Sequence, residues 1–136
     1  MNSKDYLQQA YIIDKQIRLD LQKLEAMKAS LHGRAISYDS DGTRSASRKN
    51  VMEDSIIRAV DYEQRINTEI EMLTKKRSEI ENDIISVPDE ILREVLTRRY
   101  LLYQKWEQIA EEMNYGVRHI YKLHSKALKA FPEKAS

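Results

Sequence analysis

Hydrophobic residues recur every three or four positions in the first quarter of the chain, over 6–31, where Lys, Gln, Asp and Arg fill the positions between them. The same spacing returns from 51 to about 85, and only Glu63 and Arg77 interrupt that apolar stripe. Neither helix can bury its stripe alone, so we expect the two to pack antiparallel as a coiled-coil-like helical hairpin, with pairing to a second copy as a further option. The first stripe holds Tyr6, Ala10, Ile13, Ile17, Leu21, Leu24, Met27 and Leu31, and the second holds Met52, Ile56, Ala59, Ile66, Ile70, Leu73, Ile80, Ile84 and Val87.

Two segments without this period divide the chain. Residues 32–50 are rich in Ser, Gly, Asp and Arg and predict a flexible loop between the two helices. Pro88 cannot continue a helix, so the second helix ends there and a new one begins nearby, and the spacing of Ser86 and Asp89 resembles a capping box. The predicted domains are therefore a hairpin over 1–87 and a second helical domain over 88–136.

The second domain has the spacing of a helix-turn-helix. A helix over 106–113 carries a small residue, Ala110, where the two helices approach closely. Asn114 to Gly116 predict a tight turn, since Asn and Gly tolerate a positive φ. A further helix from Val117 to about Ala130 directs Ile120 and Leu123 inward. The chain is therefore predicted to be all-α.

The outward face of the last helix is basic. Val117, Arg118, Tyr121, Lys122 and Ser125 form one stripe, and Lys126 and Lys129 extend it without any acidic residue. Arg118 or Lys122 can donate to guanine O6 and N7 in a major groove, and Val117 can pack on a thymine methyl. Lys126 and Lys129 suit phosphates. An ordinary solvated face is the alternative.

Composition removes most other functions. The 136 residues include only 3 Gly and 2 Pro with 33% charged residues, which suits long helices and not a β-sandwich or barrel. Absence of Cys excludes disulfides, thiolate metal sites and Cys nucleophiles. The net charge of +1 describes no globally basic protein, so any nucleic-acid binding depends on where the charges lie.

We expect no enzymatic activity, no metal and no cofactor. His119 and His124 lack a third ligand at helical spacing, and the sequence contains no pair of nucleophile and base and no phosphate-binding glycine loop. No apolar run reaches the roughly 18 residues of a membrane span, and the first residues lack the core of a signal peptide. We therefore expect a cytoplasmic protein without a membrane partner.

The segments LREVLTRRYL, WEQIAEEM and YGVRHIYKLHSKAL resemble region four of bacterial sigma factors. Together with DYLQQAYIIDKQI and INTEIEMLTKKRSEI, they make nearly the whole chain similar to phage late transcription regulators of the RinA and ArpU type. The resemblance implies a phage or prophage protein that activates late or packaging genes with host RNA polymerase. The positions matching the base-reading residues are Val117, Arg118, Tyr121 and Lys122. Lys105 and Gly116 depart from the pattern, because sigma factors usually place Ser or Thr there as helix caps.

The predicted function is sequence-specific binding of double-stranded DNA by a transcriptional regulator. For Arg98 and Arg99, favourable interaction with the end of their own helix and contact with DNA phosphate are both open. A phage packaging protein such as a small terminase subunit, or a polymerase-binding adaptor that does not touch DNA, are the alternatives. The residues predicted to contact phosphate are Arg98, Arg99, Lys105, His119, Ser125, Lys126 and Lys129.

Overall fold

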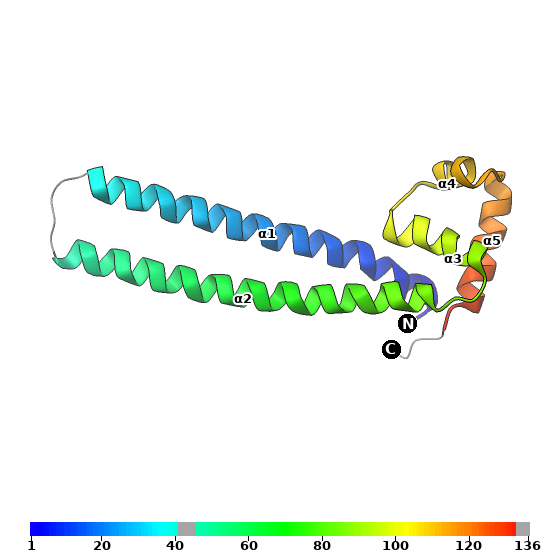
Figure 1. The fold of residues 1–136 in the computed structure, drawn as a ribbon, viewed down its shortest axis with the longest axis horizontal. Coiled ribbons are helices and arrows are strands. Elements are labelled where there is room, and N and C mark those ends of the chain that lie inside the picture. The colour runs from blue at the N-terminus through cyan, green and yellow to red at the C-terminus, as the bar shows by residue number, and fades with distance from the viewer. Residues whose placement is uncertain (41–45, 133–136) are drawn as a thin grey trace. The chain divides into compact units, whose positions relative to one another are not determined.

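The computed structural model describes the backbone of residues 1–40 and 46–132 and the side chains of 1–32 and 50–132. Every regular element in this part of the chain is a helix, which confirms the all-α prediction (Figure 1). One of these elements, η1, is a π-helical turn that continues directly from α3. The elements are α1 (Ser3–Ser40), α2 (Ala46–Ile85), α3 (Glu90–Leu96), η1 (Thr97–Leu101), α4 (Trp106–Met113) and α5 (Val117–Ala130).

The two long helices extend well into the segment predicted to be a loop. Helix α1 continues to Ser40 and α2 begins at Ala46, so the loop prediction for 32–50 is wrong over 32–40 and 46–50. Residues 41–45 lie outside the described part of the chain. Extending an existing helix adds one hydrogen bond for each residue fixed, so a helix can continue beyond the end of its apolar stripe.

The chain divides into two compact units. Unit 1 comprises 1–15 and 74–136, and unit 2 comprises 16–73. Helices α1 and α2 contribute to both units, so the start of α1 and the end of α2 belong with the C-terminal helices. Pro88 lies just beyond the end of α2, as predicted, but the compact units do not divide there.

Unit 2 is built from two antiparallel helical segments. Leu24, Ile66 and Leu73 are buried, and Lys28 Nζ of α1 lies 3.6 Å from Glu63 Oε1 of α2. Glu63, one of the two polar interruptions of the α2 stripe, therefore has an opposite charge across the pair. Such an exposed ion pair contributes little stability, but it favours this register over others.

Two stripe positions of unit 2 differ from the prediction. Leu21 is 52% exposed, and the neighbouring Asp20 is buried at 3% exposed. Ile56 is 41% exposed, while Ser55 is less exposed than Ile56. A strict alternation of three and four residues from Ile17 to Leu24 passes through position 20, and one residue further rotates a side chain by about 100° away from the partner helix.

In unit 1, the ends of the hairpin helices share a core and a polar cluster. Arg77 Nε of α2 donates to both carboxylate oxygens of Asp14 of α1, each at 3.1 Å. The Tyr103 hydroxyl donates to the same carboxylate and lies 3.2 Å from the Ala10 carbonyl. Arg77, the second polar interruption of the α2 stripe, is thus neutralised by Asp14 of α1. Tyr103 joins the segment after η1 to α1. The apolar core around this cluster includes Leu7, Ala10, Ile13, Ile80, Ile84 and Val87.

The connection into α3 is capped by Asp89. Its carboxylate accepts from the amides of Ile91 at 2.9 Å and Leu92 at 3.1 Å. The predicted capping box at Ser86 is not formed, because the Ser86 hydroxyl donates to the Asp83 carbonyl at 2.6 Å. Because the backbone of Asp89 is extended, its side chain can fold over the first turn of α3.

Candidate nucleic-acid interface

Helices α4 and α5 pack as the sequence predicts for a helix-turn-helix. Ile109, Ala110 and Ile120 form a buried cluster, and Ala110 is only 4% exposed. A larger side chain at Ala110 would hold the two helices apart, so the small residue is required by the packing. Four partly buried side chains close the cluster, namely Trp106, Met113, Val117 and Leu123.

The turn between these helices depends on Asn114. It adopts the left-handed conformation with φ 60° and ψ 40°, and the Tyr115 amide donates to the Ala110 carbonyl at 2.9 Å. Asn is one of the few residues with a side chain that adopts this conformation readily. Gly116 has φ −74°, so the turn uses the positive φ of Asn114 and not the freedom of glycine.

Both helices of the motif begin without a side-chain cap. Lys105 precedes α4 and Gly116 precedes α5; the lysine ammonium has no acceptor and glycine has no side chain, so no side chain accepts from the first turn of either helix. The first amides of each helix therefore lack the oxygen that Ser, Thr, Asp or Asn would supply. A cation at Lys105 is also on the unfavourable side of the helix dipole, so nothing in the fold explains its position.

The outward face of α5 carries four cations that the fold leaves unpaired. All four are exposed, and none has an ion pair with a described residue: Arg118, Lys122, Lys126 and Lys129. Arg118, Lys122 and Lys126 are spaced four residues apart, a spacing at which like charges repel along a helix. The mutual repulsion of these three cations therefore disfavours α5, and an anionic ligand would relieve it.

The other predicted residues of α5 lie at the edges of this basic face. Ser125 is exposed beside the cations, whereas Val117 is partly buried and packs on the helix-turn-helix core. His119 is exposed, with its ring 4.8 Å from the Tyr115 ring. Tyr121 is 46% exposed, and its ring meets the Trp106 ring edge to face at 5.3 Å between centroids.

Behind Tyr121 lies a buried group of rings centred on His124. His124 Nε2 is 2.6 Å from the Tyr100 hydroxyl, and its ring lies 4.7 Å from that of Trp106. Burial lowers the pKa of His124 to about 4, with smaller contributions from the charges of Lys4 and Arg99. The imidazole is therefore neutral at pH 7 and acts as a packing residue. The same burial raises the pKa of Tyr100 to about 12.

Arg98 and Arg99, both predicted to contact phosphate, have partners within unit 1. Arg98 Nε donates to Glu94 Oε2 at 2.8 Å, and Arg98 Nη1 donates to the Glu112 carboxylate. Arg99 Nη1 donates to the Gln104 carbonyl at 3.0 Å, and its guanidinium lies 4.2 Å from the centre of the Trp106 ring. Both arginines therefore join α3 and η1 to α4, which the sequence alone did not reveal.

Lys4 was not among the residues predicted from the sequence. Its charge lowers the pKa of His124, and the neighbouring Tyr6 ring lies 5.8 Å from Phe131 at the end of α5. The start of α1 is thus brought beside the helix-turn-helix by packing within unit 1. No local pattern could have revealed this, because 125 residues separate the two rings in the chain, from 6 to 131.

Unit 1 also contains an apolar groove of about 410 Å³ between α1 and η1. Tyr11 and Ile12 are 50% and 56% exposed along it, and Arg99 is the only charged side chain in its lining. Its volume is sufficient for side chains of a protein partner. Its remaining lining residues are Leu7, Gln8, Tyr100 and Tyr103.

The described residues contain no cluster of three or more His, Cys, Asp or Glu side chains placed to hold a metal ion. None of the helices in that part of the chain has a stretch long and apolar enough to cross a membrane. In comparisons with known proteins, no family model matches the chain, and no curated protein or solved structure matches it significantly.

Proposed function

We propose that the chain binds double-stranded DNA in a sequence-specific manner through the outward face of α5 and thereby regulates transcription. The observation that carries this proposal is the row of exposed, unpaired cations on a helix that a helix-turn-helix core holds in place. Arg98 and Arg77, in contrast, have carboxylate partners. Unpaired cations at repulsive spacing are costly for a helix alone and favourable against a polyanion.

In this proposal α5 lies in the major groove, with each residue in a distinct role. Arg118 and Lys122 donate to guanine edges, since both are exposed and lie one helical turn apart. Tyr121 contributes its exposed edge, and Trp106 restricts the orientation of its ring. Val117 offers only its uncovered part to a thymine methyl.

Phosphate contacts come from the ends of the motif. Lys126 and Lys129 extend the basic face, Ser125 and His119 are exposed on the same helix, and Lys105 is exposed just before α4. We omit Arg98 and Arg99 from this set, because their guanidinium groups already bind within unit 1. Phosphate contacts supply affinity and salt dependence, whereas the contacts of Arg118 and Lys122 supply the choice of sequence.

We further propose that the protein is a phage or prophage regulator that activates late or packaging genes together with host RNA polymerase in the bacterial cytoplasm. The resemblance of the C-terminal segments to sigma region four motivates this part of the proposal. The apolar groove beside Tyr11 and Ile12 offers a surface for a polymerase segment that α5 does not use. We propose no catalytic step, metal or cofactor.

The test begins with selection of bound duplexes from a random library, followed by fluorescence anisotropy across salt concentrations. We expect one sequence motif and a negative slope of log affinity against log salt. The double variant R118A/K122A should lose preference for the motif. Variants K126A and K129A should weaken binding to all duplexes and reduce the salt slope by about 0.9 for each phosphate that the variant no longer neutralises.

A matched control is K75A/K76A, which removes two exposed cations of α2 in the same unit and should leave binding unchanged. Circular dichroism confirms that each variant keeps its helix content. Equal affinity of R118A/K122A and the unaltered protein for the selected motif would refute the assignment of α5 as the DNA-reading helix.

A packaging protein, such as a small terminase subunit, is the second candidate. Exposed aliphatic side chains in unit 2, among them Leu19, Ile57 and Val60, favour self-association. A closed ring of many copies would suit packaging, whereas a monomer or dimer would suit a regulator. Light scattering of the full chain distinguishes them by mass.

A further inference from the structure

Unit 2 carries a row of alternating charges on the surface of α2. Asp54, Arg58, Asp61 and Arg65 follow at intervals of four, three and four residues, so they lie on one face of the helix. The signs along this face alternate from acidic to basic. We call these four residues the charged stripe.

The fold of unit 2 supplies the charged stripe with no ion pair among the described residues. All four side chains are exposed, and none forms an ion pair with a described residue, although spacings of three and four would allow pairs along the helix. Arg65 lies instead over the Tyr62 ring, 5.8 Å from its centre. Elsewhere in the unit, Glu63 is paired with Lys28, so α2 does pair charges that face α1.

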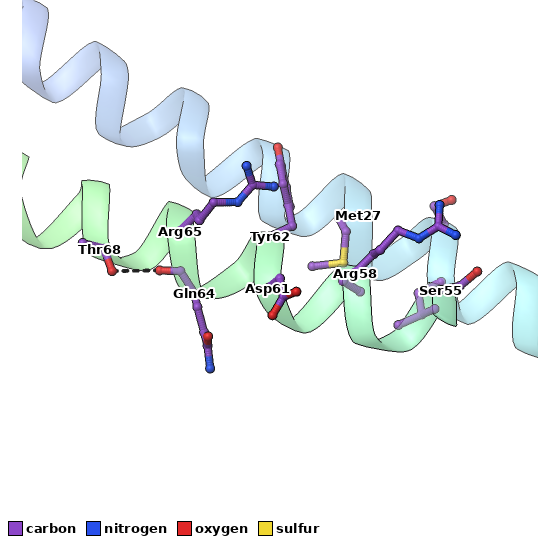
Figure 2. Close-up of a pocket in the computed structure, with 11 residues that line it drawn as sticks. Met27, Ser55, Arg58, Asp61, Tyr62, Gln64, Arg65 and Thr68 are labelled. Atoms are coloured by element: carbon purple, nitrogen blue, oxygen red, sulfur yellow. Dashed lines mark hydrogen bonds between the residues drawn. The ribbon is translucent and has the colours of Figure 1, made fainter. Parts of the chain in front are cut away.

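The stripe borders an open groove of about 940 Å³ formed by α1 and α2 of unit 2 (Figure 2). Figure 2 shows the Tyr62 ring between the side chains of Arg58 and Arg65. Met27 and Leu31 of α1 also line the groove, and both are only partly covered. The groove thus combines apolar area with unpaired charges of both signs, as does a protein interface.

The order of charges is self-complementary. In the reverse direction along the chain, the charged stripe has a basic residue at each place where the forward direction has an acidic one. A second α2 in antiparallel orientation therefore places an opposite charge beside every residue of the charged stripe. With the two-fold axis between Ala59 and Val60, Asp54 lies level with Arg65 of the second copy, and Arg58 lies level with Asp61 of the second copy. A parallel pair in register would place like charges together.

We therefore propose that unit 2 forms a two-fold symmetric dimer in which the charged stripes of two α2 helices pair antiparallel. Each dimer has four ion pairs, which determine orientation and register, while apolar area of the groove such as Met27 and Leu31 supports the aliphatic parts of the arginine side chains. Because these pairs are exposed, the dimer is weak and dissociates at high salt. The inference does not depend on DNA binding.

Sedimentation equilibrium of the full chain at low salt tests the proposal. We expect a monomer–dimer equilibrium, and R58E/R65E and D54R/D61R should each weaken it at least about tenfold, because each makes the stripe uniform in sign. Mixing these two variants should restore a heterodimer, and the four-residue exchange D54R/R58D/D61R/R65D should restore a homodimer. E53K/E71K is the matched control, since it changes net charge as much as D54R/D61R does, at exposed positions outside the stripe.

Cross-linking tests the register. The chain has no cysteine, so introduced thiols are the only ones present. A mixture of D54C and R65C should form a disulfide-linked heterodimer. D54C alone should not, because eleven residues of rise, about 16 Å along the axis, separate the two copies of position 54.

Several results would overturn the proposal. One is a chain that stays monomeric at every concentration tested at low salt. Another is a dimer that both charge reversals leave unchanged while helix content is retained. Efficient self-linking of D54C would instead indicate a parallel pair.

Discussion

The cations of unit 1 fall into two groups that differ in their partners. In the first group, Arg77 binds Asp14 and Arg98 binds Glu94 and Glu112. In the second group, Arg118 and Lys122 on α5 are exposed and have no carboxylate partner among the described residues. The two groups have the same charge and lie in the same compact unit.

The difference separates cations that hold the fold together from cations that remain available to a ligand. A paired, partly buried cation holds helices together, and its loss leaves a carboxylate without its partner. An unpaired, exposed cation contributes little to the free energy of folding, so its removal should change ligand binding more than stability. On this basis Arg98 belongs with the frame of unit 1, although its sequence position beside Arg99 also suits a phosphate contact.

The largest effect on stability is expected at Arg77. The substitution R77M removes the guanidinium that faces Asp14, and we expect the free energy of unfolding to fall by about 2 to 3 kcal/mol. Urea denaturation at pH 7 measures this change. Neighbouring Lys76 is exposed, and K76M should stay within about 0.5 kcal/mol of the unaltered protein. An equal loss of stability in R77M and K76M would contradict the distinction between paired and unpaired cations.

Acid should destabilise unit 1 through His124. The folded protein holds the pKa of His124 near 4, below its ordinary value of 6.5, so between these values the unfolded chain binds more protons. The contribution of His124 to the free energy of unfolding is therefore complete above pH 6.5 and is lost as the pH falls to 4. We expect a loss of about 2 kcal/mol, which allows for the incomplete burial of the ring. Urea denaturation from pH 4 to 7 measures it.

The matching controls are two histidine substitutions. H124Q should flatten the pH dependence between 4 and 6.5, whereas H119Q, at an exposed position, should leave it as in the unaltered protein. The same pH profile for both variants would contradict the role of the buried ring.

Asp20 extends the comparison to a buried acid in unit 2. Its side chain is 4% exposed, Oδ1 lies 3.5 Å from Lys23 Nζ, and Oδ2 has no hydrogen-bond partner among the described residues. We expect D20L to raise the free energy of unfolding by about 1 to 2 kcal/mol, because it replaces a poorly paired polar group with an apolar one.

Thermal unfolding measures the D20L effect, and E25L at an exposed position of α1 is the control that should stay within about 0.5 kcal/mol. Destabilisation by D20L would contradict the argument that the Asp20 carboxylate is poorly paired.

Arg98 and Arg118 provide the direct comparison between the groups. We expect R98A to cost about 1 kcal/mol, since its ion pairs are partly exposed, and R118A to change the free energy of unfolding by less than about 0.5 kcal/mol. A double-mutant cycle of R98A with E112A should show a coupling that falls with added salt. Absence of coupling would place Arg98 among the free cations.

The smallest effect is expected at Lys105. K105S supplies a cap for α4 and removes a cation from its first turn, so we expect a gain of about 0.5 to 1 kcal/mol. K105A removes the charge without adding a cap and should gain less. If Lys105 also contacts phosphate, both variants bind DNA less tightly while folding as well or better. A loss of stability in K105S would contradict the cap argument.

Much of the C-terminal motif could be predicted from the sequence. Three local features of this motif follow from a short segment of sequence. They are the small Ala110 where the helices approach closely, Asn114 at positive φ and the inward position of Ile120. The basic face of α5 is equally local, because helical periodicity alone places Arg118 and Lys122 outside. The failure in the 32–50 segment is also local, since apolar spacing does not determine where a polar helix ends.

Local sequence was thus sufficient to predict which residues form helices in the motif and which face of α5 is basic. Packing between distant segments decides which charges are free, because Arg98 meets Glu112 across 14 residues and Arg77 meets Asp14 across 63. Helical periodicity acts over three or four residues, whereas the partner of a charge depends on which helices come together. Asp20 and Leu21 show the same limit, since the helix that packs against α1 decides which of two neighbours is buried.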